Sequence, residues 1–469
     1  MGVFGTIYTC YSGVCTATTG MKVVADNIAN LNTTGFKRSR YEFANEIATA
    51  IQEVFVKEKG LGSMVKSIRT LYTQGGITTT DVPTDLAISG KGFFIVSDQN
   101  GNIFYTRDGQ FFVNEVDENH FALQNSLDLY LLGADPAATT ADLTSLRTYL
   151  IPKVMPPQGT SEVNLQVIFD SRKSLETTDD PLWQNYDATR ETALEDGKYD
   201  FVWSLPIYDS LGEQRTLQLY ADRTSNPNEY ELLVALDDPS LDGRGQGPYQ
   251  GAFLYGILTF GGNGDVTDAR FWEITDPSSF DPNDPNTNPM DLTTLGRPQF
   301  TLNIQGNTQT ITLDLGFQVE PDGSITRTSY ASKLLANPFV QLYYNQNGYA
   351  QGIFDKIEVI TEEGLIRAWY TNGQNIEVAK IFLADFTGYE DSLVKIGSNL
   401  FQAKEGVTPF IFAPGLYKRG RLISGALEGS NVDLATEFID LIVLQRAFQS
   451  NVRAIVTADQ TLEDFLNKT

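Results

Sequence analysis

The chain is poor in the residues that catalysis and metal binding most often use. Its 469 residues include one histidine, His120, and two cysteines, Cys10 and Cys15. A Ser-His-Asp or Cys-His site is therefore restricted to His120, whose place in a predicted loop or strand end favours a structural role. The 59 acidic residues form pairs by chance, so they do not by themselves predict a hydrolase. We expect no catalytic residue, no cofactor and no metal ion.

Basic residues are also scarce, 34 against 59 acidic residues, which gives a formal net charge of -25 and a pI near 4.4. This charge argues against nucleic acid or an anionic membrane surface as a partner, because neither attracts an acidic protein. No apolar run reaches the length of about 18 residues that crosses a bilayer, so we expect no membrane insertion. We also find no signal peptide led by lysine or arginine, and expect any export to use a route without a cleavable signal.

What the chain does contain is an apolar stripe at each end, with apolar residues recurring every three or four positions. The stripe residues that we expect to form an assembly seam are Ile7, Val14, Met21, Val24, Ile28 and Leu31 at the start, and Phe438, Leu441, Phe448, Val452, Ile455, Leu462 and Leu466 at the end. This is the coiled-coil period, and each stripe predicts a helix of about 45 to 50 Å. Cys10 and Cys15, five residues apart on the first helix, are too far apart for a disulfide.

The apolar pattern alone allows two interpretations of how these helices become ordered. Burial of two narrow stripes does not offset the backbone entropy lost when both ends become ordered, which favours ordering by many copies packed side by side. The alternative is a coiled coil within one molecule that caps a globular domain. In either case the two terminal helices are expected to pack against each other.

The middle of the chain has the period and the turns of antiparallel β structure. Asn100-Gly101, Asp108-Gly109 and Asn372-Gly373 are strong hairpin signals between short apolar strands. A proline-rich boundary at 155–159 precedes a segment, 161–337, with 28 acidic and 11 basic residues. We expect a multidomain α+β protein with paired terminal coiled-coil helices (1–33 and 424–469), a connecting region (34–75), an inner β domain in two parts (76–158 and 338–423) and an outer acidic β domain inserted into it (159–337).

Local signals mark the ends of the helices and the connecting region. Gly35 is predicted to take the left-handed C′ position of a Schellman turn, with an apolar contact between Leu31 and Phe36. The last helix is predicted to start at the capping sequence 430–433. Near-helical spacing in the connecting region predicts a short helix followed by irregular chain, on the residues Tyr41, Phe43, Ile47, Ile51, Val54 and Phe55.

Several segments resemble the bacterial flagellar rod and hook proteins, an axial protein family. The helix-end segment DNIANLNTTGFKR (26–38) is similar to that family's signature, through Asn27, Asn30, Asn32, Gly35 and Phe36. DLAISGKGFFIV (85–96), YTRDGQF (105–111) and the whole of 424–466 also resemble the family. Within it, the segments 207–220, 258–266 and 343–352 favour the hook members over the shorter distal rod members.

The resemblance implies a structural subunit of the flagellar hook that polymerises into a curved, flexible tube and transmits torque from rod to filament. It implies a helical homopolymer as the first partner, and contacts with the hook cap, the distal rod, the hook–filament junction protein and the flagellar type III export apparatus. The implied location is the extracellular hook of the flagellum. Alternatives are a distal rod or other axial protein, and a non-flagellar secreted adhesin or glycan hydrolase.

Overall fold

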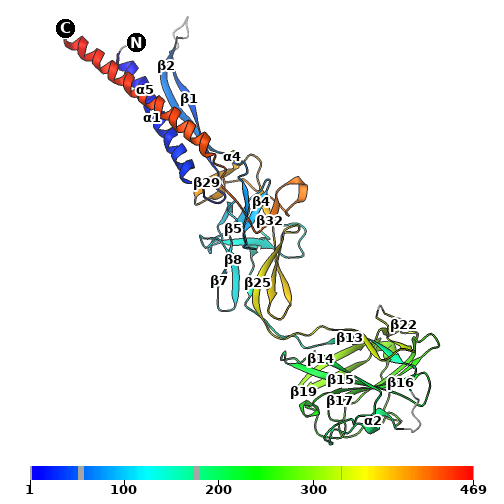
Figure 1. Ribbon diagram of the computed structural model, residues 1–469. Coiled ribbons are helices and arrows are strands. Elements are labelled where there is room, and N and C mark those ends of the chain that lie inside the picture. The colour runs from blue at the N-terminus through cyan, green and yellow to red at the C-terminus, as the bar shows by residue number, and fades with distance from the viewer. Residues whose placement is uncertain (1–2, 51–56, 174–179, 329, 468–469) are drawn as a thin grey trace. The chain divides into compact units, whose positions relative to one another are not determined.

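The computed structural model describes residues 3–50, 57–173, 180–328 and 330–467 (Figure 1). Within these residues five α-helices accompany sheets whose strands pair mostly in antiparallel fashion. This confirms the α+β class expected from the sequence. The chain divides into two compact units, named unit 1 (Met1–Lys153 with Phe354–Thr469) and unit 2 (Val154–Ile353).

Both limits of unit 2 differ from the expected 159–337, because residues 154–158 and 338–353 belong to it and not to the inner β domain. At the second limit the cause is strand β24 (Val340–Gln346), which pairs antiparallel with β13 (Glu162–Asp170) of the same unit. The pairing partner of a strand depends on the fold around it, so the sequence near Pro338 did not reveal this partner.

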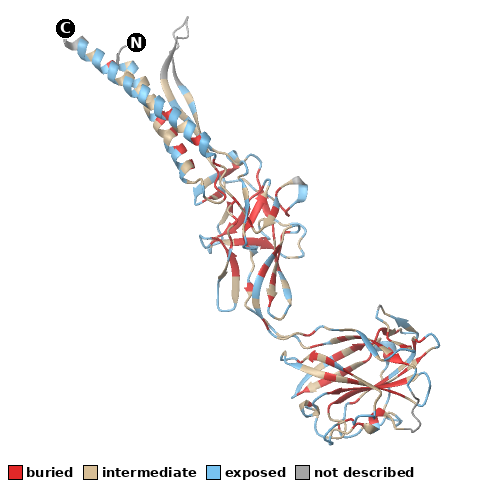
Figure 2. Ribbon diagram, in the orientation of Figure 1, coloured by how far each residue is buried: buried red, intermediate tan, exposed pale blue. Residues whose placement is uncertain are grey.

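The two long helices of unit 1 are α1 (Val3–Ala29) and α5 (Leu434–Asn467), which pack against each other (Figure 1). The predicted start of α5 is confirmed, since Oδ1 of Asp433 accepts a hydrogen bond from the backbone N–H of Thr436 at 2.7 Å. Figure 2 shows that both helices carry long exposed stretches, whereas buried residues gather in the β structure of each unit.

The helix predicted in the connecting region is wrong. The chain there forms a long antiparallel hairpin of β1 (Ser39–Ala50) and β2 (Lys57–Thr70), with register shifts at Glu42/Phe43 and Glu46/Ile47. Tyr41, Phe43 and Ile47 fit a period of two as well as a helical one, and their side-chain types favour strands. Ile51, Val54 and Phe55 lie outside the described residues. Pairing with β2, which also contacts α1, decided between the two periods.

The rest of unit 1 is β structure with a main sheet in the order β25-β26-β27-β9-β5-β6-β30-β29, to which β7, β8, β10 and β11 add, and with the small pairs β3-β33, β4-β32 and β28-β31. The bounds are β3 Ile77–Thr79, β4 Leu86–Ser89, β5 Phe94–Ser97, β6 Ile103–Thr106, β7 Phe112–Glu115, β8 His120–Gln124, β9 Tyr130–Ala134, β10 Arg147–Thr148, β11 Ile151–Pro152, β25 Gly352–Ile360, β26 Leu365–Tyr370, β27 Asn375–Ile381, β28 Leu383–Asp385, β29 Leu393–Gly397, β30 Leu400–Ala403, β31 Phe410–Phe412, β32 Arg421–Ser424 and β33 Ala426–Glu428, with the short helices α4 Tyr389–Ser392 and η2 Leu416–Lys418.

Unit 2 contains two larger sheets, one in the order β14-β15-β16-β17-β18 and one in the order β19-β20-β13-β23 with β24 on the other side of β13. The bounds are β12 Val154–Met155, β14 Phe201–Tyr208, β15 Gln214–Arg223, β16 Glu229–Leu236, β17 Ala252–Phe260, β18 Val266–Glu273, β19 Gln299–Ile304, β20 Asn307–Asp314, β21 Phe317–Val319, β22 Ile325–Arg327 and β23 Lys333–Leu335, with the short helices α2 Leu182–Asn185, η1 Pro239–Leu241 and α3 Leu292–Leu295.

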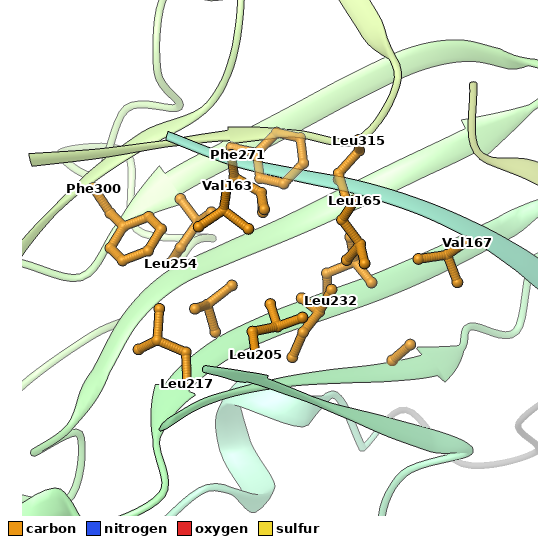
Figure 3. Close-up of a cluster of buried hydrophobic side chains, with 14 of the residues drawn as sticks. Val163, Leu165, Val167, Leu205, Leu217, Leu232, Leu254, Phe271, Phe300 and Leu315 are labelled. Carbon is orange, nitrogen blue, oxygen red and sulfur yellow. The ribbon is translucent and has the colours of Figure 1, made fainter. Parts of the chain in front are cut away.

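The core of unit 2 lies between these two sheets. Val163, Leu165 and Val167 point from β13 toward Leu205 and Leu232 of the opposite sheet (Figure 3). Every second residue of β13 is buried in this way, which is the pattern of a strand with one face on a core. Unit 1 has a separate cluster that includes Phe93, Ile95, Phe382 and Phe401.

Candidate assembly surface

Helices α1 and α5 meet along a seam in which small residues of α1 face larger residues of α5. A Cβ atom added at Gly13 would lie 2.7 Å from Nδ2 of Asn451, and one added at Gly20 would lie 3.0 Å from Cδ2 of Leu444. The two glycines therefore set how closely the helices approach. On α5, Asp440 and Ala454 are half-buried, and the other buried and half-buried residues of the helix recur at spacings of four and three positions: Glu437, Leu441, Leu444, Phe448, Asn451, Ile455, Ala458 and Leu462.

Ten of the residues predicted for the seam are buried or half-buried: Ile7, Val14, Met21, Val24, Ile28, Leu31, Leu441, Phe448, Ile455 and Leu462. Of these, Leu441, Phe448, Ile455 and Leu462 belong to the series on α5 described above, whereas Leu31 follows the end of α1. Phe438 and Val452 are instead exposed, and the side chain of Leu466 lies outside the described part. The sequence pattern missed Leu444 and Ala458, because α5 has apolar residues around much of its circumference and a spacing of three and four fits more than one face.

The exposed apolar residues of the two helices form what we name the outer stripe. On α5, Ile439 is 62% exposed and Val443 is 58% exposed; on α1, Phe4 is 72% exposed and Tyr11 is 60% exposed. The full set is Phe4, Tyr8 and Tyr11 on α1, and Leu434, Phe438, Ile439, Ile442, Val443, Val452 and Val456 on α5, where it spreads over about half of the circumference of the helix. Single exposed apolar residues are ordinary, but so many of them on two packed helices are typical of a surface that another protein covers.

Asn27, from the predicted helix-end motif, joins three elements at the base of the helices. Its side chain is almost fully buried; Nδ2 donates to the carbonyl of Ser39 at 2.8 Å and to Oε2 of Glu437 at 3.1 Å, while Oδ1 accepts from the N–H of Ser39 at 2.9 Å. Glu437 also forms an ion pair with Arg38, at 3.1 Å. The contact therefore holds α1, the start of β1 and the first turn of α5 together.

The other residues of that motif do not form the predicted Schellman turn. Helix α1 ends at Ala29, six residues before Gly35. Gly35 does have a left-handed φ of 68°, but its N–H donates to the carbonyl of Glu428 at 2.7 Å and not to the helix. The remaining members are placed separately: Nδ2 of Asn30 donates to the carbonyl of Asp26, Asn32 is exposed, and Phe36 is buried beneath Nζ of Lys395.

A buried ion cluster lies close to this motif. Nζ of Lys37 is 2.6 Å from Oε1 of Glu428, and Nη1 of Arg107 is 3.0 Å from Oε2 of the same carboxylate. Oε1 also accepts the N–H of Gly75 at 2.9 Å, and Nζ of Lys37 donates to the carbonyl of Thr73 at 2.8 Å. Desolvation lowers the pKa of Lys37, although the Glu428 carboxylate opposes that change.

This cluster brings together three segments that the sequence singled out separately. Lys37 belongs to 26–38, Arg107 to 105–111 and Glu428 to 424–466. The sequence did not predict the cluster, since ion pairs between residues hundreds of positions apart leave no periodic signal.

The single histidine has a local partner, whereas the two cysteines form no disulfide. Nδ1 of His120 lies 2.9 Å from Oδ1 of Asp117, three residues earlier, and Cys10 and Cys15 are free thiols. Among the described residues no group of three or more His, Cys, Asp and Glu side chains has an arrangement suited to a metal ion. Nor does any helix in that part of the chain have the length and hydropathy needed to cross a bilayer.

Four flagellar family profiles match successive parts of the chain. They are the flagella basal body rod protein (residues 7–37), the flagellar hook protein FlgE/F/G D1 domain (87–146), the flagellar basal body protein FlaE D2 domain (174–349) and the flagellar basal body rod FlgEFG protein C-terminal region (423–468). The first and last include most of α1 and all of the described α5.

Full-length relatives give the same assignment. The flagellar hook protein FlgE of Treponema pallidum (strain Nichols) is 30% identical over 495 residues, and that of Borreliella burgdorferi is 30% identical over 478 residues; each alignment covers 98% of both chains. FlgE of Escherichia coli (strain K12) is 28% identical and covers 97% of this chain and 98% of its own. A crystal structure of Helicobacter pylori FlgE2 covers 74% of this chain and 98% of its own at 17% identity with a TM-score of 0.45, a likeness that carries no conclusion about the fold. The identity to FlgE over the whole length shows that the chain belongs to the flagellar hook protein family.

Proposed function

We propose that the chain is a structural subunit of the bacterial flagellar hook, and that it polymerises into the curved, flexible tube that joins rod to filament and transmits torque. Membership of the hook protein family supports the hook as its place of action. The observation that carries self-assembly is the outer stripe, an apolar surface along α1 and α5 that nothing in the described chain covers. No catalytic role belongs to this proposal.

The two faces of α5 suit two different contacts, one within the molecule and one between copies. The inner face packs against α1 within one molecule, through the four-and-three alternation that includes Leu444 and Ala458. The outer stripe is then the face that a neighbouring copy covers, with the α1–α5 pair acting as a coiled coil. A head-to-tail contact that does not close produces an open helical polymer, which is the assembly that a tube requires.

The wider setting follows from the family. The proposal includes export through the flagellar type III apparatus, assembly beneath the hook cap, and contacts with the distal rod at one end and the hook–filament junction protein at the other. Unit 2, with most of the negative charge of the chain, would supply the outer part of the tube as an inserted domain. An acidic surface suits a solvent-facing position because it limits nonspecific association.

A pair of substitutions tests the role of the outer stripe. Val456 is an exposed member of the stripe, and Leu211 of unit 2 is an apolar residue, 68% exposed, that lies outside both helices. Val456→Asp loses about 1.5 to 3 kcal/mol of apolar burial per subunit and adds a charge, so the concentration needed for polymerisation should rise at least about tenfold. Leu211→Asp should polymerise nearly as the unaltered protein does.

The measurement is sedimentation and negative-stain electron microscopy of purified subunits over a concentration series. Circular dichroism of the monomers checks that both variants keep the helices and sheets. Tubes of Val456→Asp at the normal critical concentration would contradict the proposal, as would a subunit that remains monomeric at every concentration.

A further inference from the structure

Strand β24 of unit 2 is an edge strand that a register shift at Leu342 interrupts but that neither proline nor charge protects. It pairs with β13 on one side, and no other strand pairs with it among the described residues. Edge strands commonly carry proline or charge, which blocks the approach of other strands. The outer strands of the opposite sheet do so, with Pro206 in β14 and exposed Asp268 and Arg270 in β18. Strand β24, with the sequence VQLYYNQ, has neither.

Apolar and aromatic side chains are exposed along this strand. Leu342 is 53% exposed and Val340 is also exposed. Beside them the rings of Tyr330 and Tyr343 stack with centroids 4.2 Å apart and an interplanar angle of 4°. We name these four residues the β24 patch. Stacking fixes the two rings in place, so the patch is a preformed surface and not a set of independent side chains.

Charge indicates what this patch can contact. Unit 2 contains 28 acidic and 11 basic residues, yet the 21 residues of 334–354 include no charged residue. Two copies of so acidic a unit repel each other wherever negative faces meet. A neutral, apolar face can approach an acidic neighbour without that repulsion. The β24 patch therefore suits a contact with another copy of this same chain.

From the edge position, the exposed apolar residues and the local neutrality, we propose that the β24 patch is where unit 2 contacts the acidic unit 2 of a neighbouring copy. The inference rests on the proposed polymerisation and adds a second contact to it, separate from the outer stripe of α1 and α5. Because the patch has no ion pair to break, its contact depends on apolar burial and on the absence of like charge.

Opposite charges at a single position test this contact in the full-length protein. Leu342→Glu places a negative charge against the acidic neighbour, whereas Leu342→Lys places a positive charge there with a similar loss of apolar area. We expect Leu342→Glu tubes to depolymerise at a lower temperature than unaltered tubes, with recovery in 0.5 M NaCl, and Leu342→Lys tubes to be the more stable of the two variants. The matched control is Leu211→Glu, at a residue of unit 2 that is 68% exposed and remote from the patch in sequence.

Hydrogen exchange supplies a second readout that needs no substitution. Outer-edge amides of 340–346 should exchange about tenfold or more slowly in tubes than in monomers, while those of the 209–213 turn change little. Equal exchange of β24 in tubes and monomers would overturn the proposal, and so would Glu and Lys variants that depolymerise together with the control. If the unaltered protein forms no tubes, the assembly proposal fails and this inference fails with it; tubes with an unaffected β24 refute this inference alone.

Discussion

At the scale of single residues, unit 1 contains a buried lysine that is paired with a carboxylate and a partly buried aspartate whose side chain accepts a backbone hydrogen bond. Lys37 lies 2.6 Å from Glu428, whose carboxylate opposes the lowering of the Lys37 pKa by desolvation. Asp108 has one hydrogen bond from the N–H of Gln110 to Oδ1, at 3.1 Å, and burial raises its pKa to about 6, with a further contribution from Asp85. Glu428 therefore contributes to the junction of three segments, whereas the ionised form of Asp108 opposes folding.

Asp108→Asn should remove a pH dependence from the stability of unit 1. The folded pKa of about 6 lies above the ordinary value of 3.8, so the folded state binds the proton more tightly. The stabilising contribution of Asp108 is thus complete below pH 4 and is lost as pH rises to about 6. The amide keeps the acceptor for Gln110 without the charge, so above pH 7 the variant should be more stable by on the order of 1 to 3 kcal/mol, less any solvent screening.

The check is thermal unfolding of both proteins between pH 4 and pH 8. The gain of Asp108→Asn should be large at pH 8 and should vanish near pH 4. Asp98→Asn is the control of opposite sign, since hydrogen bonds from Asn102 lower the pKa of the exposed Asp98. A gain of Asp108→Asn that stays constant with pH would show that the carboxyl group is not the cause.

At the scale of elements, each terminal helix has two apolar faces with different neighbours. Close approach of α1 to α5 depends on Gly20, where an added Cβ would meet Leu444 at 3.0 Å and Phe43 at 3.2 Å. The hairpin adds a third element, since Oγ1 of Thr16 and Oγ of Ser63 lie 2.9 Å apart and the N–H of Ser63 donates to Oγ of Ser12. The helix pair and the hairpin therefore form one packed unit in the monomer.

Gly20→Val should loosen that packing. The two added methyl groups have no space between Leu444 and Phe43, so we expect a loss of about 1 to 3 kcal/mol and faster hydrogen exchange in α5 of the monomer. Gly5→Ala is the matched control, because a Cβ there meets nothing within 4 Å and alanine favours the helix by about 0.5 to 1 kcal/mol. Unchanged α5 exchange in Gly20→Val would contradict the close contact described for Gly20.

Sequence periodicity predicted a helix or strand correctly where it fitted one type of secondary structure, and failed where it fitted both. Strands β6 (Ile103–Thr106) and β14 (Phe201–Tyr208) lie between clear turn signals, and alternation or apolar runs were enough to locate them. In the connecting region the same aromatic residues fitted a helix and a strand, and the partner β2 was decisive. On α5 the period predicted a helix but not which apolar face turns inward, because that depends on the glycines of α1.

At the scale of the whole molecule, periodicity and turn signals predicted the α+β class, the distribution of acidic residues predicted the uneven charge, and the resemblance of both ends predicted the family. The exact limits of unit 2 were not predictable, because they depend on β24 pairing with a strand that begins 178 positions earlier in the chain, at Glu162. Each unit nevertheless contains its own apolar core, with members such as Phe401 in unit 1 and Leu232 in unit 2. Separate cores imply separate cooperative unfolding.

The monomer should therefore melt in two calorimetric transitions that single core substitutions shift independently. Leu232→Ala removes a fully buried side chain of unit 2 and should cost about 2 to 5 kcal/mol, which lowers one transition by roughly 5 to 15 °C. Phe401→Ala should lower the other transition to a similar extent, because its side chain fills the core of unit 1. A single transition that both substitutions lower equally would mean that the two units unfold as one, and the division at residues 153/154 and 353/354 would then have no thermodynamic meaning.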